Sequence, residues 1–253
     1  MLAECNSLKS INFDNINTSS VLDMSYLFYN CFTLVSLDLS SFDTSSVTDM
    51  TNMFAECGSL TSLDLSNFNT EKVEDMNAMF SGCQAITSLD VSNFNTENVT
   101  KMNGMFSGCQ ALLSLDLSKF DTKNVTRMDN MFKESLELTT IYVGDDWNTE
   151  NVTNSKEMFL DCSAIVGQDG TTYDEESTDK AKAHYDEGGY LTYKPLYLRG
   201  DANGDGVIDK EDAQFVTDII LGTRYDYDIK TADANGDGII NMSDIMFIVN
   251  FCL

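Results

Sequence analysis

The sequence predicts an α/β solenoid, built from 26-residue repeats of a strand and a short helix, followed by a small all-α module with a duplicated loop and helix. Two observations lead to this fold class. Apolar residues return at a fixed interval of 26 positions through most of the chain, and an acidic stretch of twelve residues near the C-terminus occurs twice. Repetition of this length is typical of proteins in which similar structural units stack on one another.

A methionine–phenylalanine pair marks the repeat. It occurs at Met53-Phe54 and returns every 26 residues, with one extra residue before the last copy. The later copies are Met79-Phe80, Met105-Phe106, Met131-Phe132 and Met158-Phe159. Leu27-Phe28 keeps the same phase, and so does Met1-Leu2. Residues 1–162 are therefore predicted to form the repeat array, and because the first residues already lie inside a repeat, we expect the array to be truncated at its N-terminus.

Residues 60–83 show what each repeat is expected to form. Leu63 and Leu65 alternate with polar residues, which predicts a short strand with one buried face. Asn69-Thr70 then supplies turn and cap chemistry. The apolar residues that follow are spaced by three and four positions, which predicts a short amphipathic helix. They are Val73, Met76, Met79, Phe80 and Cys83.

A strand and a helix within 26 residues is the signature of a leucine-rich repeat. The consensus sequence of the repeat, LxSLDLSxFxTxxVxxMxxMFxxC, resembles the BspA-like leucine-rich repeats of bacterial surface proteins. The resemblance covers residues 1–162. It implies a secreted or surface-anchored protein that acts in adhesion or protein binding.

A cysteine recurs once in each repeat, at Cys5, Cys31, Cys57, Cys83, Cys109 and Cys162, with Ser135 in one of the places. Equivalent residues of stacked repeats lie about 5 Å apart, which is within reach of a disulfide. Each cysteine would then have two equal neighbours, and the chain holds an odd number of them, 7. Buried thiols that fill the core are therefore the preferred interpretation, with disulfides as the alternative.

Aspartates form a second ladder, flanked by serines, at Asp38, Asp64, Asp90 and Asp116. They are expected to face outward on the concave side of the array. One interpretation is a solvated face whose carboxylates bind local backbone donors, and the other is a groove for a protein, a glycan or cations. Tyr142 and Trp147 are the aromatic residues placed to stack on such a ligand, although Trp147 holds the phenylalanine position of its repeat.

The repeat pattern stops at Ser163, and residues 163–195 are predicted to be a C-terminal cap and linker. A short strand is expected around residues 190–193, and His184 is expected on the surface. Lys194-Pro195 contains the only proline of the chain and marks the junction with the last module.

The acidic stretch opens the C-terminal module, residues 196–253. DANGDGVIDKED begins at Asp201 and DANGDGIINMSD at Asp233. Both carry oxygen side chains at positions 1, 3, 5, 9 and 12 and glycine at position 6, which is the pattern of a twelve-residue calcium loop. We therefore predict two Ca²⁺ ions, each held by side-chain oxygens and by the carbonyl at position 7. The predicted ligands are Asp201, Asn203, Asp205, Val207, Asp209 and Asp212 in the first loop, and Asp233, Asn235, Asp237, Ile239, Asn241 and Asp244 in the second.

Each loop is followed by an apolar segment that is expected to be a helix, over residues 212–221 and 244–253. No helix is expected before the first loop. The inner faces of the two helices are predicted to pack together. The first contributes Ala213, Val216 and Ile220, and the second contributes Ile245, Ile248 and Cys252.

This duplicated loop and helix resembles the type I-like dockerin, a module that attaches proteins to cohesin domains of a cellulosome scaffoldin. The resemblance covers residues 196–253 and implies calcium-dependent cohesin binding. It places cohesin recognition at loop positions 10 and 11 and at the helical residues that follow them. The predicted partner-binding residues are Lys210, Glu211, Gln214, Phe215, Asp218, Met242, Ser243, Met246, Phe247 and Asn250.

The composition excludes several classes of function. A net charge of -26, from 41 acidic and 15 basic residues, disfavours nucleic-acid and anionic-membrane partners. No apolar run is long enough to span a membrane, and no signal peptide opens the chain. Neither a nucleophile-and-base motif nor a second histidine beside His184 is present, so we expect no enzyme.

The sequence thus predicts a non-catalytic cellulosome or bacterial cell-surface component, located outside the cell, whose repeats form a recognition scaffold. Two alternatives are a freestanding surface adhesin with a calcium-stabilised C-terminal module, and a non-catalytic fragment of a polysaccharide-degrading enzyme.

Overall fold

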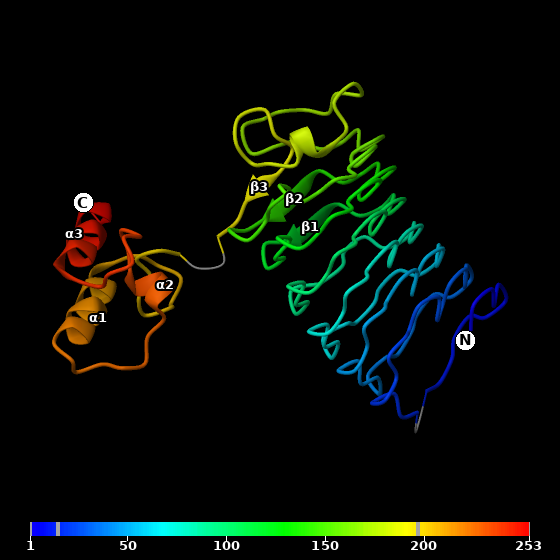
Figure 1. Ribbon diagram of the computed structural model, residues 1–253, viewed down its shortest axis with the longest axis horizontal. Helices are drawn as coiled ribbons and strands as arrows, with labels where there is room; N and C mark the ends of the chain where they lie inside the picture. Colours follow the sequence, from blue (N-terminus) through cyan, green and yellow to red (C-terminus); the bar gives the residue numbers. More distant parts are fainter. Residues whose placement is uncertain (1, 14–15, 196–197, 253) are drawn as a thin grey trace. The chain divides into compact units, whose positions relative to one another are not determined.

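The computed structural model describes residues 2–13, 16–195 and 198–252 (Figure 1). The chain divides into two compact units, Met1–Lys194 and Pro195–Leu253. The predicted repeat array and cap both fall in the first unit, and the predicted calcium module falls in the second.

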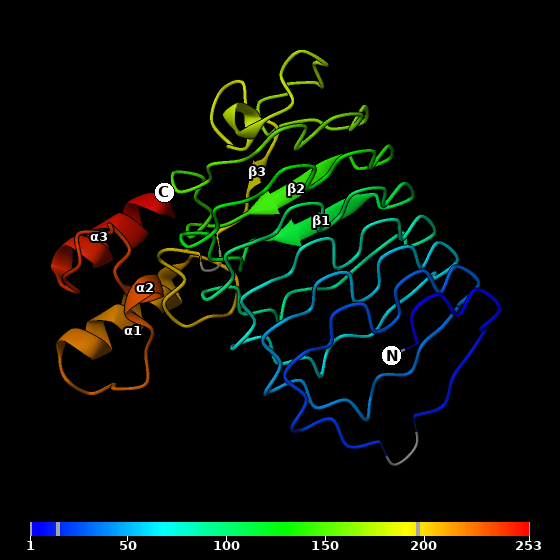
Figure 2. The same ribbon diagram turned by 45° about the vertical axis from the view of Figure 1, so that its right-hand side comes forward.

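The first unit is a stack of coils, in which each turn of the stack takes one sequence repeat (Figures 1 and 2). Parallel bridges join every coil to the next at one position of the repeat. They link Asp23 to Asp49, Asp49 to Asp75, Asp75 to Lys101, Lys101 to Arg127 and Arg127 to Asn154. The interval is 26 residues until the last bridge, which is one residue longer, so the stack keeps its register across the inserted residue.

No α-helix forms in the described part of this unit, and the short helix expected in each repeat was a wrong prediction. In one representative coil, the N–H groups of Met76, Ala78, Phe80 and Gly82 donate to carbonyls of the next coil at 2.7–3.0 Å. The N–H groups between them close tight turns, for example Met79 N–H to the Met76 carbonyl at 3.3 Å. Ala78 and Gly82 have φ values of 51° and 71°, a left-handed conformation that a right-handed helix does not contain. Successive turns therefore produce the apolar spacing that resembles a helix.

The core of the first unit runs along the stack as a column of phenylalanine rings. Rings of neighbouring coils stack with centroids 5.4–6.0 Å apart and interplanar angles of 3–19°. The column consists of Phe28, Phe54, Phe80, Phe106, Phe132 and Phe159, all fully buried. Buried methionine, valine and cysteine side chains lie beside it. A single repeat could not bury these rings, so the coils stabilise one another.

In the part of the stack that the structure describes, the only sheet is a small parallel one at the C-terminal end (Figure 2). Its strands are β1 (Ser114–Leu117), β2 (Thr140–Val143) and β3 (Thr192–Tyr193), in that order. The strand expected at Leu63 and Leu65 is not formed. There the nitrogen of Thr61 lies 3.4 Å from the carbonyl oxygen of Val35. The equivalent bond beside β2, from Thr139 N–H to the Leu113 carbonyl, is 2.9 Å, so the hydrogen bonds between neighbouring strands are short only in the last coils.

The predicted cap covers the end of the stack. The Tyr190 ring is fully buried and meets the Phe159 ring edge-on, with centroids 5.4 Å apart, so the phenylalanine column ends inside the protein. A short 3-10 helix, Lys180–Lys182, and strand β3 belong to this cap. The predicted strand near residue 192 is therefore present, and His184 is half-buried rather than fully exposed.

The described residues of the second unit, 195 and 198–252, form three helices, α1 (Lys210–Ile220), α2 (Ile229–Ala232) and α3 (Met242–Phe251) (Figure 1). Helices α1 and α3 begin two residues before the predicted starts, because Asp209 and Asn241 act as N-caps and form capping boxes. The one-turn helix α2, capped by Asp228, was not predicted. Leu253, at the end of the second predicted helix, lies outside the described residues.

Helices α1 and α3 pack on one another around a small core in which Ala213, Val216 and Ile248 are buried. Two residues assigned to this core are misplaced in the prediction. Ile220 is 40% exposed and Cys252 is exposed, because they lie at and beyond the ends of short helices whose first two turns make the contact. Side chains from loop position 8, Ile208 and Ile240, complete the core instead.

Among the described residues, no helix has the length and the apolar character needed to cross a membrane.

Candidate calcium loops and docking surface

The first acidic loop is folded around its opening aspartate. The Asp201 carboxylate accepts the N–H groups of Gly204, Asp205 and Gly206 at 2.9–3.0 Å. Gly204 and Gly206 have φ values of 79° and 89°, which glycine adopts without strain. The loop thereby curls its backbone around a carboxylate that is nearly buried.

Asp212 closes the first loop from within α1. Its two carboxylate oxygens accept the N–H of Asn203 at 3.1 Å and the N–H of Asp209 at 2.8 Å, and the residue is fully buried. No ion pair between described residues involves Asp212. A carboxylate that is removed from water without a cation is energetically costly, so this site favours a bound positive charge.

The second loop repeats this geometry. Asp233 accepts the N–H groups of its loop positions 4, 5 and 6 at 2.8–3.1 Å. The buried Asp244 accepts the N–H groups of Asn235 at 3.1 Å and Asn241 at 2.8 Å. One contact has no counterpart in the first loop and no signal in the sequence: Arg199 packs so tightly on Gly236 that a methyl group there would lie 1.7 Å from Nη1.

The donor chemistry of both loops fits Ca²⁺. Carboxylates, asparagine amides and one carbonyl are hard oxygen donors, and calcium takes six to eight of them. No three carboxylate, imidazole or thiol side chains converge on one metal position among the described residues. The predicted ligand sets contain amide and carbonyl oxygens in addition to the carboxylates, and such oxygens would supply part of the coordination. The assignment of the twelve ligands stays a prediction.

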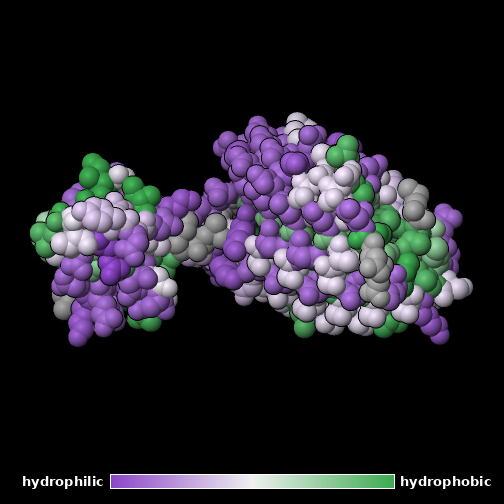
Figure 3. All heavy atoms as spheres, turned by 90° about the horizontal axis from the view of Figure 1, so that it is seen from below, coloured by the Kyte–Doolittle hydropathy of each residue, from purple (hydrophilic) through white to green (hydrophobic). Residues whose placement is uncertain are grey.

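The residues predicted to contact a partner are mostly exposed. Met242, Met246 and Phe247 are 62%, 53% and 43% exposed, which is unusual for large apolar side chains. Figure 3 shows that apolar residues also gather on part of the surface of the second unit. The other exposed members of the predicted set are Lys210, Glu211, Gln214, Ser243 and Asn250.

Two members of that set are less accessible than predicted. Phe215 is half-buried, because its ring packs against the core of the second unit and is covered by the Arg224 guanidinium, 3.9 Å from the ring centroid. Asp218 is half-buried and accepts a hydrogen bond from the Gln214 side chain at 2.9 Å. The two halves of the module therefore differ, with a polar surface along α1 and an apolar one along α3.

In the first unit, the aspartate ladder lies at the surface. Asp38, Asp64 and Asp90 are exposed, and each accepts the N–H of the serine two residues later at 2.9–3.0 Å. The Ser40 hydroxyl and N–H lower the pKa of Asp38. The aspartates therefore bind local donors, as one of the two interpretations requires. Small hollows of about 330 and 130 Å³ also separate Asp38 from Asp64 and Asp64 from Asp90.

The aromatic candidates lie at the last coils. Trp147 is 9% exposed and donates from Nε1 to the Ala183 carbonyl at 3.1 Å, so it belongs to the core beneath the cap. Tyr142 is half-buried, and the Lys194 ammonium group lies 5.7 Å from its ring centroid. Lys194 also forms an ion pair with Asp116, the last aspartate of the ladder.

The cysteine ladder consists of free thiols among the described residues. Cys57 is buried, and its Sγ donates to the Phe28 carbonyl of the preceding coil at 3.2 Å. Burial raises the pKa of Cys57 to about 12. Ser135 makes the equivalent bond to the Phe106 carbonyl at 2.8 Å. The slot therefore selects a small side chain with one hydrogen-bond donor, which explains why serine replaces cysteine there.

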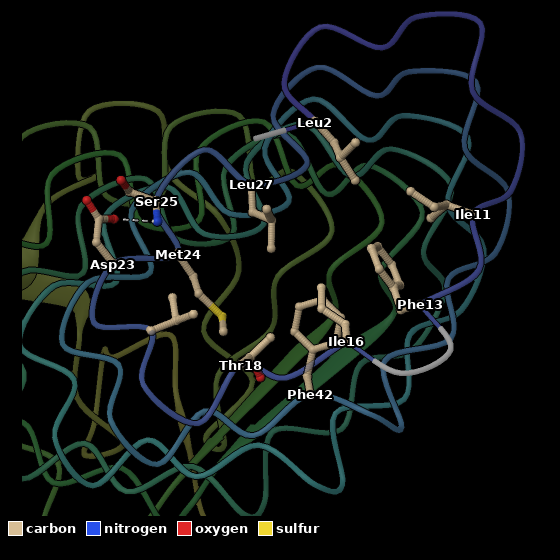
Figure 4. A pocket seen from close by; sticks show the side chains of 11 residues that line it. Leu2, Ile11, Phe13, Ile16, Thr18, Asp23, Met24, Ser25, Leu27 and Phe42 are labelled. Carbon is tan, nitrogen blue, oxygen red and sulfur yellow. Dashed lines mark hydrogen bonds between the residues drawn. The ribbon is translucent and has the colours of Figure 1, made fainter.

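At the N-terminal end of the stack, the apolar interior reaches the surface in a pocket of about 370 Å³ (Figure 4). Phe13, Phe42 and Leu27 line it, and the Asp23 carboxylate lies at its side, accepting the Ser25 N–H at 2.8 Å. The pocket is continuous with the core and contains no cluster of catalytic groups.

Comparison with known proteins identifies two regions. The family described as "Mycoplasma protein of unknown function, DUF285" matches residues 1–89 and 82–190. The dockerin type I domain matches residues 199–253. Neither a curated protein nor a solved structure matches the chain. The dockerin match supports calcium binding and cohesin-type protein interaction by the second unit.

Proposed function

The chain belongs, over residues 1–190, to the family of Mycoplasma proteins of unknown function named DUF285, and on that premise we propose that it is a non-catalytic cellulosome or cell-surface component. Its C-terminal dockerin binds a cohesin of a scaffoldin in a calcium-dependent manner, and its coils form a recognition scaffold outside the cell. The observation that carries this proposal is the pair of equivalent loops, each closed by a buried aspartate that forms no ion pair with any described residue.

Two Ca²⁺ ions are the proposed complement of the second unit. Bound calcium supplies the positive charge that the acidic loops otherwise lack. Asp201 and Asp233 hold the turns of their loops, while Asp212 and Asp244 connect each loop to the first turn of a helix. The loop carboxylates thereby couple ion binding to the orientation of α1 and α3.

The proposed cohesin surface is dominated by α3. Met242, Met246 and Phe247 expose apolar area that a module with so small a core leaves uncovered, and a protein partner would bury it. The corresponding surface of α1 offers Lys210 and Glu211, which are charged. Because the two halves present different chemistry, we propose that the cohesin binds in one orientation.

The repeats are proposed to belong to the BspA-like leucine-rich repeats. The parallel bridges at a 26-residue interval and the continuous phenylalanine column support this assignment, although the repeats contain turns in place of helices. The scaffold role is proposed to be non-catalytic because the only histidine, His184, lies half-buried in the cap and no nucleophile motif accompanies it.

A pull-down of the full chain on an immobilised type I cohesin, with calcium and with excess EDTA, tests the proposal. We expect retention in calcium and release in EDTA, and release also for a variant with Asp212→Ala and Asp244→Ala in calcium. Retention that is equal in EDTA, or failure to bind any member of a panel of type I cohesins in calcium, would contradict it.

A second candidate, a freestanding adhesin, draws support from the hollows between Asp38, Asp64 and Asp90, which are lined by polar groups. In that role, a glycan or protein would bind the aspartate ladder. A chain that binds no cohesin but adheres to a glycan array, with adhesion lost in Asp64→Ala, would favour this candidate over the first.

A further inference from the structure

The hydrogen bonds between coils have a direction. In each coil, N–H groups at alternate residues point forward and donate to carbonyls of the next coil. The N–H groups of Met102 and Gly104, for example, donate to the Arg127 and Asp129 carbonyls at 3.0 and 2.8 Å. At each junction one bond has the opposite direction and is donated to the preceding coil, as from Thr126 N–H to the Thr100 carbonyl at 2.9 Å. Every coil therefore needs acceptors from the coil that follows it.

The last coil has no following coil, and the cap satisfies only part of its edge. The Phe159 N–H donates to the Thr178 carbonyl at 2.8 Å, and the Asp161 N–H donates to the Tyr173 hydroxyl at 3.0 Å. The forward N–H groups of Ser155 and Glu157 have no partner among the described residues, and the Thr153 carbonyl accepts no bond there. In the preceding coils, the equivalent N–H and carbonyl groups are hydrogen-bonded to the coil that follows.

A hollow of about 690 Å³ lies beside these unpaired groups. One wall is the edge of the last coil, residues 153–157, and the other is the cap segment around Glu176 and Thr178. A volume of several hundred Å³ is that of an ordinary binding site. The hollow is therefore wide enough to admit a further chain segment at the position where the stack would continue.

We propose that this edge groove, formed by residues 153–157 and the facing cap segment, binds a segment of another protein chain that adopts the turn conformation of a coil. The segment adds as the next parallel rung, so that two of its carbonyls, two residues apart, accept from Ser155 and Glu157 N–H, while one of its N–H groups donates to the Thr153 carbonyl. As in other cases where a peptide adds to an unpaired backbone edge, main-chain hydrogen bonds provide the affinity.

The chemistry of the groove favours a polypeptide. The unpaired groups are one acceptor and two donors at residues 153, 155 and 157, which is the pattern that the structure itself pairs with the backbone of the following coil at every junction. The Glu157 carboxylate is neutralised by Lys133 at 2.8 Å and Lys156 at 3.1 Å. The edge of the last coil therefore carries little uncompensated charge, and it is better matched to the uncharged backbone of a peptide than to a polyanion.

This inference rests on the proposed recognition role of the coils but does not depend on cohesin binding. The test uses the full chain and a display library of random nonapeptides as the probe. We expect enriched peptides to bind and to slow hydrogen exchange at the Ser155 and Glu157 amides by tenfold or more. Cohesin retention, measured on the same samples, separates failure of this site from failure of the dockerin proposal.

Substitutions at one position provide a matched pair. Ser155→Pro removes one free N–H without breaking an internal hydrogen bond, and it should reduce peptide affinity by tenfold or more. Ser155→Ala keeps the N–H and should bind as the unmodified chain does. If the proline variant fails to fold, Glu176→Trp, which fills the groove from the exposed cap side, should have the same effect on binding.

The proposal is overturned if no peptide is enriched, if bound peptides leave exchange at both amides unchanged, or if Ser155→Pro or Glu176→Trp, when folded, binds as tightly as Ser155→Ala. Protection of both amides that grows with protein concentration, without peptide, would assign the groove to a second copy of the chain and would also overturn it.

Discussion

Replacing Asp212 by asparagine separates the two roles that the structure assigns to this residue. The side chain keeps its size, but an amide has only one acceptor oxygen. The fully buried Asp212 accepts two N–H groups, from Asn203 and Asp209, whose own residues are partly exposed. In Asp212→Asn, one of these bonds is lost, because the side-chain NH₂ group then faces a backbone N–H. The carboxylate that closes the predicted calcium loop is also removed.

The magnitude follows from those two losses. A buried hydrogen bond to a charged group contributes about 1.5–3 kcal/mol, and this part of the cost is independent of metal. If the first site no longer fills at a calcium concentration of about 100 times its dissociation constant, a further ~2.7 kcal/mol is lost. We therefore expect the second unit to lose about 4–6 kcal/mol in calcium and about 1.5–3 kcal/mol in chelator.

Urea unfolding of the full chain can follow each unit separately. Circular dichroism at the helical band reports the second unit, because all described α-helices lie there. Trp147, the only tryptophan, lies in the core of the first unit, and its fluorescence should be unaffected. Asp218→Asn is the matched control, since Asp218 lies on α1 and is half-buried but closes no loop.

An unchanged helical transition for Asp212→Asn in calcium would refute the structural reasoning. A loss that is the same in calcium and in chelator would refute the role of Asp212 as a ligand while leaving its hydrogen bonds in place.

Three further predictions concern other surfaces. Met246→Glu places a charge on the exposed apolar surface of α3 and should weaken cohesin binding at least tenfold by calorimetry. Iodoacetamide at pH 8 should modify the exposed Cys252 rapidly and Cys57 only on unfolding, because burial raises the pKa of Cys57 to about 12. Hydrogen bonds from the Thr171 hydroxyl, the Gly188 N–H and the Thr171 N–H lower the pKa of Asp169 to about 2. The contribution of Asp169 to stability is therefore present above about pH 4 and should disappear as the pH falls towards 2.

Each of these has a control. Glu211→Ala, on the polar half of the module, should change cohesin affinity less than threefold, and equal losses for both variants would contradict the single orientation. Labelling of Cys57 as fast as Cys252 in the native protein would contradict its burial. Asp169→Asn should flatten the acid dependence of the Trp147 fluorescence transition, and a dependence unchanged from that of the unmodified chain would remove Asp169 as its source.

The raised pKa of the Cys57 thiol also makes the stability of the fold depend on pH. The folded pKa of Cys57 lies above the ordinary value of 9.0, so the unfolded chain releases this proton first. The burial of Cys57 therefore contributes stability below about pH 9, and this contribution should be lost as the pH rises from 9 towards 12.

The period of the chain and the two calcium-type loops could be predicted from the sequence. Met53-Phe54 and its later copies recur because each coil buries the same positions, and burial is a property that side-chain type reports directly. The loop from Asp201 is similarly local, since its glycines and aspartates bond to one another within six residues. Patterns that depend on a residue and its near neighbours are visible without a structure.

The conformation of the segment from Met76 to Gly82 could not be predicted in the same way. Apolar residues three and four positions apart occur in a helix and also in successive tight turns. The choice depends on where alternate N–H groups find acceptors, and here the next coil provides them. The exposure of Ile220 and Cys252 was decided by the lengths and crossing of two helices, which spacing within one helix does not contain.

The sequence by itself determined which residues are mostly buried in each repeat and where the acidic loops form, because these follow from the chemistry of side chains over short distances. Only the tertiary structure decided which backbone groups pair between coils, and thus that Ser155 and Glu157 are left with unpaired N–H groups at the edge of the last coil. The physical reason is that every residue carries the same N–H and C=O groups, so their partners are set by the neighbouring coil and not by residue type.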